Sequence, residues 1–237
     1  MKFGIVVFPG SNCDHDCFYV LDRVLAQETV YLWHRNQDLE GCECVVLPGG
    51  FSYGDYLRTG AIARFSPIME SIASFARAGG LVLGICNGFQ VLVETGLLPG
   101  ALLPNRQGLF ICRPAHLRVE NINTPFTNLF VPGEVVSIPI AHQQGNYFVS
   151  RETLAGLERN GHVLFRYCGP DGQIADRWNP NGSMSAAAGI LSREGNILGM
   201  MPHPERSSED ILGSRDGRRV FLSIINWFEN KRNGENR

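Results

Sequence analysis

One cysteine of this sequence stands where a nucleophile would be most useful. Cys86 lies between Gly84 and Gly88, directly after the apolar run 81–85 and directly before a helical pattern. A G-x-nucleophile-x-G turn between a strand and a helix strains its central residue and exposes that side chain. The start of the helix offers free N–H groups and a positive dipole end, which lower a thiol pKa and can stabilise an oxyanion. We therefore predict that Cys86 is a catalytic nucleophile rather than a structural cysteine beside a turn.

A cysteine nucleophile needs a histidine base, and the segment MPHPE at residues 201–205 provides the most suitable histidine. Pro204 favours an extended conformation for His203. Residues two apart in an extended chain point the same way, so Glu205 can lie beside His203. The carboxylate would accept from one imidazole nitrogen while the other faces the thiol, as in a catalytic triad. The plainer interpretation is a loop histidine between prolines beside a solvated glutamate.

A glycine-containing loop is expected at the same edge of the sheet. The segment PGGFS at residues 48–52 follows the buried run 44–47, and successive glycines allow backbone N–H groups to point into a site. We predict that a tetrahedral intermediate accepts from the N–H of Asn87 and from that of Gly50 or Phe51. An ordinary β-turn is the alternative.

The elements that carry these loops predict an α/β fold with a doubly wound, mostly parallel sheet and flanking helices. Apolar runs typical of buried strands occupy residues 2–8, 29–33, 44–47 and 81–85. Helical patterns separate them, over residues 11–25 and between Ser66-Pro67 and Gly79-Gly80. Such sheets bind ligands at the carboxyl ends of their strands, which is where the three loops fall.

The second half of the chain follows a different pattern. Residues 104–185 are rich in Pro, Gly and Asn, with short alternating runs at 134–140 and 162–167. They predict antiparallel strands and long loops that form an antiparallel edge subsheet. A strand over residues 196–201 and a last helix over residues 216–230 complete the chain. Since no repeat or low-complexity linker interrupts it, we predict a single domain over residues 1–237.

Composition excludes several classes of protein. With 237 residues and 44% hydrophobic side chains, the chain can bury the core of one α/β domain. A net charge of −2 predicts no attraction to nucleic acid or to an anionic membrane. No run reaches the ~18 apolar residues of a membrane span, and the N-terminal apolar run lacks a cleavage site. Seven cysteines, an odd number, then indicate a reducing cytoplasm.

Several cysteines cluster near His15, where they could form a metal site. Their spacings, Cys13-x₃-Cys17 and Cys42-x-Cys44, do not give two of the pairs usual in zinc sites. Cysteines of cytoplasmic proteins are mostly small buried hydrophobes, so no metal site is predicted. Three loop arginines, Arg58, Arg106 and Arg113, could meet a phosphorylated ligand or an acidic partner, but solvated arginines are the rule and no site is predicted there either.

Taken together, the elbow GICNGFQ and the MPHPE segment resemble the class I, triad-type glutamine amidotransferases. Longer segments narrow the resemblance to the glutaminase subunits of phosphoribosylformylglycinamidine synthases, enzymes of purine biosynthesis. The resemblance extends over residues 2–228. Its segments are FPGSNCDHD (8–16), PGGFSYGDYLRTGAIA (48–63), GLLPGALLPN (96–105), IPIAHQQGNY (138–147) and MPHPER (201–206).

The resemblance implies a role for each matching residue. Cys86 would be the nucleophile, His203 the general base and Glu205 the residue that orients it. Gly50 and Asn87 would supply oxyanion N–H groups, and Gln90 would help to hold the substrate glutamine. Attack on the side-chain amide would release ammonia, and water would then hydrolyse the γ-glutamyl thioester to glutamate.

The resemblance also implies partners. The chain has neither a G-x-x-x-x-G-K-[ST] phosphate loop nor a G-x-G-x-x-G fingerprint, so the ammonia acceptor chemistry is expected on another polypeptide. That partner would be a large synthetase subunit, which uses ATP and Mg²⁺ to convert formylglycinamide ribonucleotide to formylglycinamidine ribonucleotide. A small third subunit also fits this family. No cofactor is expected in this chain itself.

One position departs from the family pattern. The family usually reads AHGEG where residues 141–145 read AHQQG. Gln144 keeps the shape and hydrogen bonding of a glutamate but loses its charge, so no role of that carboxylate is carried over.

Two other functions were considered. A Cys-dependent peptidase or γ-glutamyl hydrolase would also have an elbow cysteine and a histidine, but the C-x-G-x-Q pattern and the placement of PHPE argue against it. A binding subunit with a decayed triad would not be expected to retain Cys86, His203 and Glu205.

Overall fold

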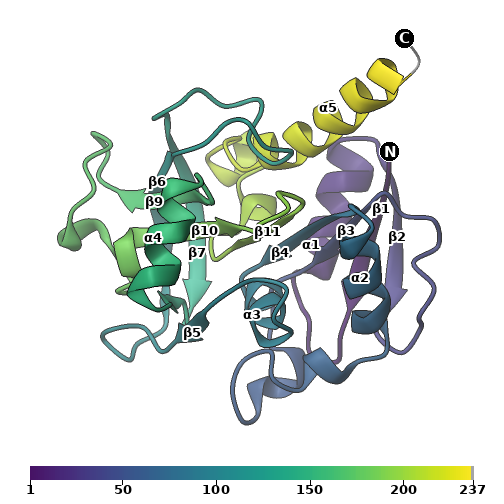
Figure 1. Cartoon of the computed structure of the whole chain (residues 1–237), viewed down its shortest axis with the longest axis horizontal. Coiled ribbons are helices and arrows are strands. Elements are labelled where there is room, and N and C mark those ends of the chain that lie inside the picture. Colours follow the sequence, from purple (N-terminus) through teal and green to yellow (C-terminus); the bar gives the residue numbers. More distant parts are fainter. Residues whose placement is uncertain (236–237) are drawn as a thin grey trace.

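The protein, described here over residues 1–235 of a computed structural model, is built around a nine-stranded mixed sheet (Figure 1). Its strands are β1 (Lys2–Val7), β2 (Glu28–Trp33), β3 (Cys44–Leu47), β4 (Leu81–Ile85), β6 (Ile111–Val119), β7 (Val135–His142), β9 (Val163–Cys168), β10 (Ala187–Leu191) and β11 (Ile197–Met200). Their order across the sheet is β2-β1-β3-β4-β11-β10-β9-β6-β7. The pairs from β2 to β11 are parallel and those from β11 to β7 are antiparallel.

The parallel half agrees with the predicted doubly wound arrangement. Strands β3 and β4 are buried along their whole length, as continuous apolar runs predict. Helices α1 (Asp14–Tyr19) and α3 (Asn87–Glu94) pack on this half, α1 on β1 and α3 on β3, β4 and β11. Helix α2 (Ile68–Arg77) contacts β4. Helices therefore separate β1 from β2 and β3 from β4 along the chain, whereas a loop connects β2 to β3.

The first helix differs from its prediction over residues 11–25. α1 covers only six residues and continues as a π-helical turn, Val20–Val24. There the N–H of Leu25 donates to the carbonyl of Val20 at 2.9 Å, five residues back. The wider turn changes which residues share a face, so periodicity alone could not place its end.

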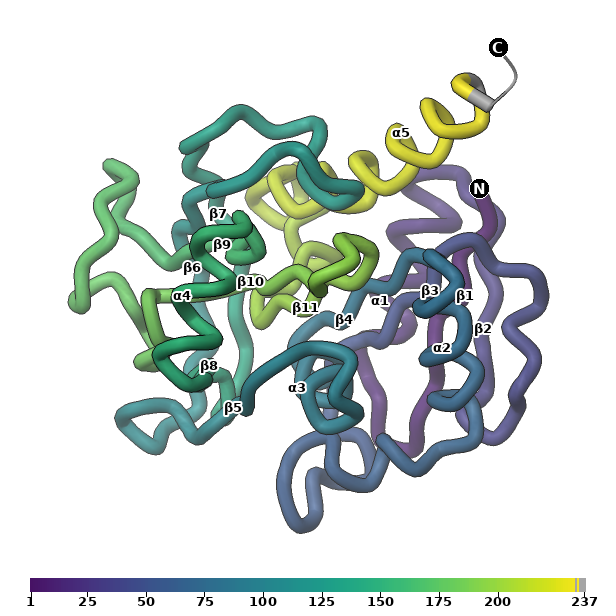
Figure 2. The backbone as a smooth tube through the Cα atoms, viewed as in Figure 1, coloured from purple at the N-terminus to yellow at the C-terminus, as the bar shows by residue number. Residues whose placement is uncertain are grey.

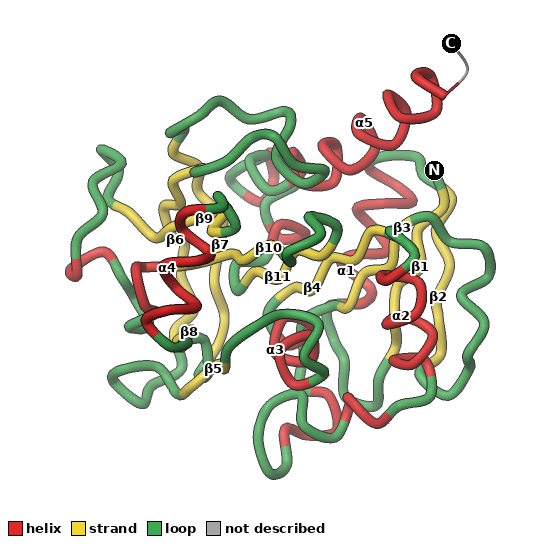
Figure 3. The backbone as a smooth tube through the Cα atoms, in the orientation of Figure 1, coloured by secondary structure: helices red, strands yellow, loops and turns green. Residues whose placement is uncertain are grey.

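The two alternating runs noted in the second half form the antiparallel strands β7 and β9, which continue the main sheet together with β6 and β10. The separate antiparallel pair is β5 (Ala101–Leu103) with β8 (Asn146–Phe148). Figure 3 shows how long loops connect these strands. Strand β6 was not predicted, because its polar residues and Pro114 hide the pattern. Pro114 pairs with Pro139 of β7, so two residues without N–H groups face each other in the ladder.

Two helices complete the fold. α4 (Arg151–Arg159), which was not predicted, begins at Ser150, whose hydroxyl accepts from the N–H of Thr153 at 3.1 Å. α5 (Arg218–Glu235) buries Val220 and Ile224, two of the three apolar residues of its predicted face. Its far end lies on the same side of the molecule as the N-terminus (Figure 2). Among residues 1–235, no helix combines the length and apolar character needed to cross a membrane.

The order of the strands decides where the predicted site residues meet. β3, β4 and β11 are neighbours, and the last residue of β4, Ile85, pairs with the last residue of β11, Met200. The loops after these parallel strands therefore leave the sheet at one edge. They carry Gly49, Cys86 and His203.

Candidate active site

The turn at Cys86 has the strained geometry expected of a nucleophile elbow. Its φ of 49° and ψ of −103° place a non-glycine residue in a sparsely populated backbone region. The N–H of Cys86 donates to the carbonyl of Met200 at 2.7 Å, which fixes the elbow to β11. A side chain at Gly88 would lie 1.9 Å from the carbonyl oxygen of Leu47, so α3 packs directly on β3 only because residue 88 is glycine. The sheet thus holds the nucleophile in a fixed position.

His203 and Glu205 form the predicted pair. Nδ1 of His203 lies 2.5 Å from Oε1 of Glu205, and both side chains are buried. His203 is extended, with φ −101° and ψ 90°, and the short 3-10 turn Pro204–Arg206 follows it. Its N–H donates to the carbonyl of Pro139 at 2.8 Å, which fixes the base against β7. The second imidazole nitrogen, Nε2, is buried and has no hydrogen-bond partner among the described residues.

The charge of His203 follows from its neighbours. Burial alone would lower the pKa of this imidazole, but the negative charge of Glu205 and, after it, the neighbouring sulfur of Cys86 outweigh that effect and raise the pKa well above its usual 6.5. The arrangement therefore favours an imidazolium beside the thiol at neutral pH. An imidazolium can give a proton to a leaving amine.

Gly49 is the point at which the three loops converge. A Cβ atom placed on Gly49 would lie 2.7 Å from Cε1 of His203, 3.1 Å from Sγ of Cys13 and 3.4 Å from Cβ of Cys86. The base and the nucleophile therefore approach the same glycine from two different strands. Any larger residue there would push the imidazole away.

The predicted oxyanion donors are not equivalent in this structure. The N–H of Phe51 donates to the carbonyl of Gly10 at 3.0 Å and is thus already engaged. Gly50 has a φ of +143°, and a Cβ there would lie 2.7 Å from the backbone nitrogen of Asn12, so the position requires glycine. The N–H of Asn87 is in the first turn of α3, where it has no acceptor within the helix.

The side chain of Asn87 connects the elbow to the glycine-containing loop. Its Oδ1 accepts from the N–H of Ser52 at 3.1 Å, and its Nδ2 donates to Oδ1 of Asp55 at 3.2 Å. Gln90 Oε1 accepts from the same Nδ2 at 2.9 Å. Asn87 thus fixes the loop after β3 relative to the nucleophile.

Gln90 links the elbow helix to the segment that departs from the family pattern. Its Nε2 donates to the carbonyl of Gln144 at 2.5 Å. The side-chain oxygen of Gln144 accepts from the hydroxyl of Thr59 at 3.2 Å. A glutamate oxygen could accept the same bond, so this contact does not require the missing charge.

Two residues around the site, Cys13 and Asn105, were not singled out as site residues by their sequence context. Cys13 is buried, and Nη2 of Arg206 donates to its Sγ at 2.9 Å. Asn105 Oδ1 accepts from Nδ1 of His142 at 3.0 Å and from the N–H of Gly145 at 3.1 Å, and so shapes the loop next to Gln144. Cys13 could have been found by its place after β1, because loops after parallel neighbours share an edge. No local signal marks Asn105.

The histidine of this loop has a different charge from His203. Burial, and then the charge of His203, lower the pKa of His142 from 6.5 to about 4. His142 is therefore neutral at pH 7. Its Nδ1 donates to Asn105, while Nε2 is buried with no partner in the described part of the chain.

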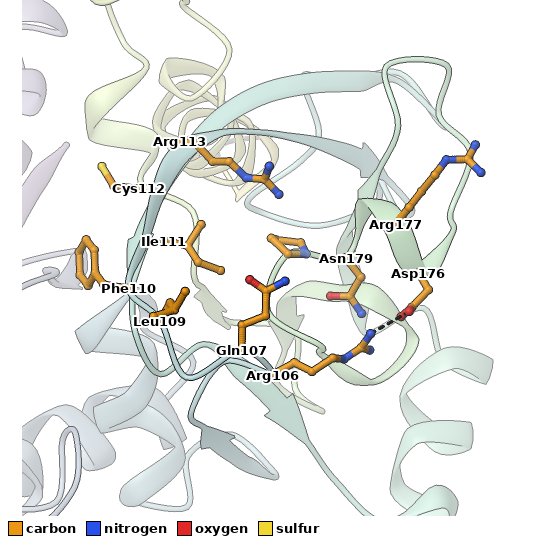
Figure 4. Close-up of a pocket in the computed structure, with 11 residues that line it drawn as sticks. Arg106, Gln107, Leu109, Phe110, Ile111, Cys112, Arg113, Asp176, Arg177 and Asn179 are labelled. Carbon is orange, nitrogen blue, oxygen red and sulfur yellow. Dashed lines mark hydrogen bonds and ion pairs between the residues drawn. The ribbon is translucent and has the colours of Figure 1, made fainter.

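A separate cavity contains two of the arginines noted in the sequence. It has a volume of about 530 Å³, and Arg106, Arg113 and Arg177 lie around it (Figure 4). Arg106 pairs with Asp176 at 2.7 Å. Arg58 is elsewhere and pairs with Glu94 at 2.6 Å. No triad residue lines this cavity, so it is distinct from the nucleophile.

Known proteins resemble this chain over nearly its whole length. Residues 1–233 match the model of the CobB/CobQ-like glutamine amidotransferase domain. The chain is 59% identical to a protein of Moorella thermoacetica named phosphoribosylformylglycinamidine synthase subunit PurQ, over 97% of both chains. It is 56% identical to the protein of the same name from Koribacter versatilis, over 95% of this chain and 97% of that one. A chain in the structure of PurLQS from Thermotoga maritima is 45% identical, with a TM-score of 0.85 over 96% of this chain and 98% of that chain.

Proposed function

Because this chain belongs to the CobB/CobQ-like glutamine amidotransferases, and among them to the PurQ subunits of phosphoribosylformylglycinamidine synthase, we propose that Cys86, His203 and Glu205 hydrolyse glutamine to glutamate and ammonia. The observation that carries the proposal is the convergence of Cys86 and His203 on Gly49, with Glu205 bound to the far nitrogen of the imidazole. A thiol, a base and an orienting carboxylate at one strand edge are the parts that amide hydrolysis requires.

The first half of the reaction starts with the imidazolium of His203 next to the sulfur of Cys86. The thiolate of Cys86 attacks the side-chain amide carbon of glutamine and forms a tetrahedral intermediate. His203, protonated on Nε2, gives its proton to the amide nitrogen, so that the C–N bond breaks and ammonia leaves. Glu205 keeps the Nδ1–H in place throughout and stabilises the positive charge.

The second half returns the enzyme to its starting state. Neutral His203 takes a proton from water, which attacks the γ-glutamyl thioester, and the thiolate of Cys86 leaves as glutamate forms. The N–H groups of Gly50 and Asn87 would stabilise the oxyanion in both steps. Phe51 would join them only after releasing the carbonyl of Gly10. Gln90, whose side chain bonds to Asn87 and to the carbonyl of Gln144, would help to hold the substrate glutamine.

Ammonia is protonated and lost in water, so the product is useful only beside an acceptor enzyme. We therefore propose that this chain docks on a large synthetase subunit, which holds ATP and Mg²⁺, together with a small third subunit. The structure of PurLQS from Thermotoga maritima, which includes a chain 45% identical to this one, supports such an assembly. Exposed apolar side chains follow the oxyanion loop, at Phe51, Tyr56 and Leu57, as is typical of a protein interface.

Two wider proposals follow from the same family. The continuous nine-stranded sheet supports a single glutamine amidotransferase domain over residues 1–237. The seven cysteines form no disulfide in the structure, which supports a place in the reducing cytoplasm.

The test is glutamate release from glutamine by the native chain and by Cys86→Ala, with and without a synthetase subunit, ATP and formylglycinamide ribonucleotide. Cys112→Ala is the matched control, because Cys112 is an exposed cysteine. Release by the native chain and the control, abolished in Cys86→Ala and increased by the partner, is the expected result. Equal release by native protein and Cys86→Ala would reject the triad.

A further inference from the structure

One buried thiol beside the triad has no part in glutamine hydrolysis. Cys13 ends the loop after β1 and is almost completely inaccessible to solvent. Its N–H donates to the carbonyl of Gly49 at 3.2 Å, which holds the thiol next to the catalytic loops. The guanidinium of Arg206 donates to its Sγ at 2.9 Å.

The surroundings of Cys13 form a set of metal ligands. One ligand atom from each of Cys13, His203 and Glu205 lies within 4.8 Å of the other two, and all three residues are buried. Nε2 of His203 and Oε2 of Glu205 are also without hydrogen-bond partners among the described residues. Cys86 borders the same space, because its Cβ and the Sγ of Cys13 both approach Gly49. Thiolate, imidazole and carboxylate are the three donors that zinc uses.

We infer that Cys13, together with His203 and Glu205, forms a site for a thiophilic divalent cation. In a tetrahedral zinc site the ligand atoms are about 3.5 Å apart, and the three ligand atoms here all lie within 4.8 Å of one another. Side-chain rotation would adjust them to the tetrahedral spacing. Binding would release the thiol proton of Cys13 and the imidazolium proton to water.

Occupation of this site would inhibit the glutaminase. The metal would bind the imidazole of His203, so this base could no longer exchange a proton beside Cys86. A chelator would reverse the inhibition. Arg206 opposes a cation by its own charge, so the affinity should be that of a regulatory or inhibitory site rather than a permanent structural one. The inference depends on the positions of the three side chains and not on their proposed catalytic roles.

The probe is cobalt(II) added to the purified, metal-free chain. We expect one ion per native chain, with the strong absorption of a thiolate–cobalt bond. Cys13→Ser should lose that absorption or bind at least about tenfold more weakly, whereas Cys112→Ser, which changes an exposed cysteine, should match the native protein. Absence of binding to native protein, or an unchanged spectrum in Cys13→Ser, would overturn the site.

A second measurement needs no variant. Anomalous diffraction at the zinc edge, from native crystals grown with zinc, should give a peak between Sγ of Cys13 and the imidazole of His203. A peak elsewhere, or none, would reject the inference even if Cys13→Ser failed to fold. Glutamate release in metal-free buffer is measured separately, so that failure of the metal site and failure of the glutaminase remain distinguishable.

Discussion

Oε1 of Glu205 lies 2.5 Å from Nδ1 of His203, within a region that excludes water from both side chains. Two residues with one proline between them thus form a buried, charge-assisted hydrogen bond. Burial lowers the pKa of this imidazole, and the charge of the carboxylate is the largest of the effects that raise it. The negative charge of Glu205 is therefore what allows His203 to act as an acid towards the leaving ammonia.

Replacing that charge should inactivate the enzyme without removing the hydrogen bond. In Glu205→Gln the amide oxygen can still accept from Nδ1, but the pKa of His203 should fall below its native value. We expect kcat/KM for glutamine to decrease by about 10²- to 10⁴-fold. Proton NMR of the imidazole measures the pKa directly. Glu152→Gln, on the exposed face of α4, is the control.

The same shift predicts the sign of a pH effect on stability. The folded-state pKa of His203 lies above the unfolded value of 6.5, so its stabilisation is complete below pH 6.5 and is lost as pH rises through the folded pKa. Glu205→Gln should lack this contribution. An identical pH dependence of unfolding in both proteins would contradict the assignment.

The titration of His142 should have the opposite effect on the pH dependence of stability. Its folded pKa of about 4 lies below the unfolded 6.5, so the unfolded chain binds the proton first as pH falls. Native stability should therefore decrease by about 3 kcal/mol between pH 6.5 and pH 4 through this group. Urea unfolding at a series of pH values measures it. His142→Gln should show a shallower loss, and exposed His15→Gln should keep the native slope.

Gly49→Ala tests whether the three loops must meet at a residue without a side chain. The new methyl group would overlap Cε1 of His203, so the imidazole must shift. We expect about 1–3 kcal/mol lower stability and about 100-fold lower kcat.

The control for that change is Gly156→Ala. Gly156 lies within α4, and a Cβ there meets no atom within 4 Å. It should stabilise the protein by about 0.5–1 kcal/mol and leave glutamate release unchanged. Native activity in Gly49→Ala would show that the site tolerates the methyl group.

Gln144→Glu restores the residue that the family usually has. The hydroxyl of Thr59 can donate to a carboxylate as well as to the present amide oxygen, so we expect kcat/KM for glutamine of the same order of magnitude. Gln143→Glu should be worse tolerated, because the amide of Gln143 donates to the carbonyl of Gly108 at 3.2 Å. Steady-state glutamate release by the two variants measures the difference in kcat/KM. A large change in Gln144→Glu would show that the charge at this position matters.

The parallel half of the fold could be predicted because its signals are local. Strands buried on both faces appear as continuous apolar runs, and the predicted β3 and β4 match the structure residue for residue. Cys86 and His203 follow from the same rule, since loops after neighbouring parallel strands share an edge. No local pattern predicts that β4 pairs with β11. If the loops at Cys86 and His203 form one site, however, the strands that precede them must lie close together.

The rest depends on contacts between distant residues. Strand β10 (AAGIL) is made largely of small residues, and Arg113 and Pro114 interrupt the first half of β6, so the alternation of β6 is confined to residues 115–119. Asn105 acts only through hydrogen bonds to His142 and Gly145, which no local pattern reveals. The spacing in the sequence associates Cys13 with Cys17. In the fold, the sulfur of Cys13 accepts a hydrogen bond from the guanidinium of Arg206.

The pairing of β4 with β11 also decides when the enzyme comes into existence. Leu83 pairs with Leu198, a residue far along the chain. The nucleophile, which follows β4, is therefore synthesised early, and the base, which follows β11, is synthesised late. Contacts between such distant segments form slowly, after the intervening loops have closed. A chain emerging from the ribosome therefore contains its cysteine long before it contains the β11 strand that fixes the elbow and the histidine that would act as base. The nascent chain should therefore not hydrolyse glutamine until nearly the whole protein has been synthesised and folded.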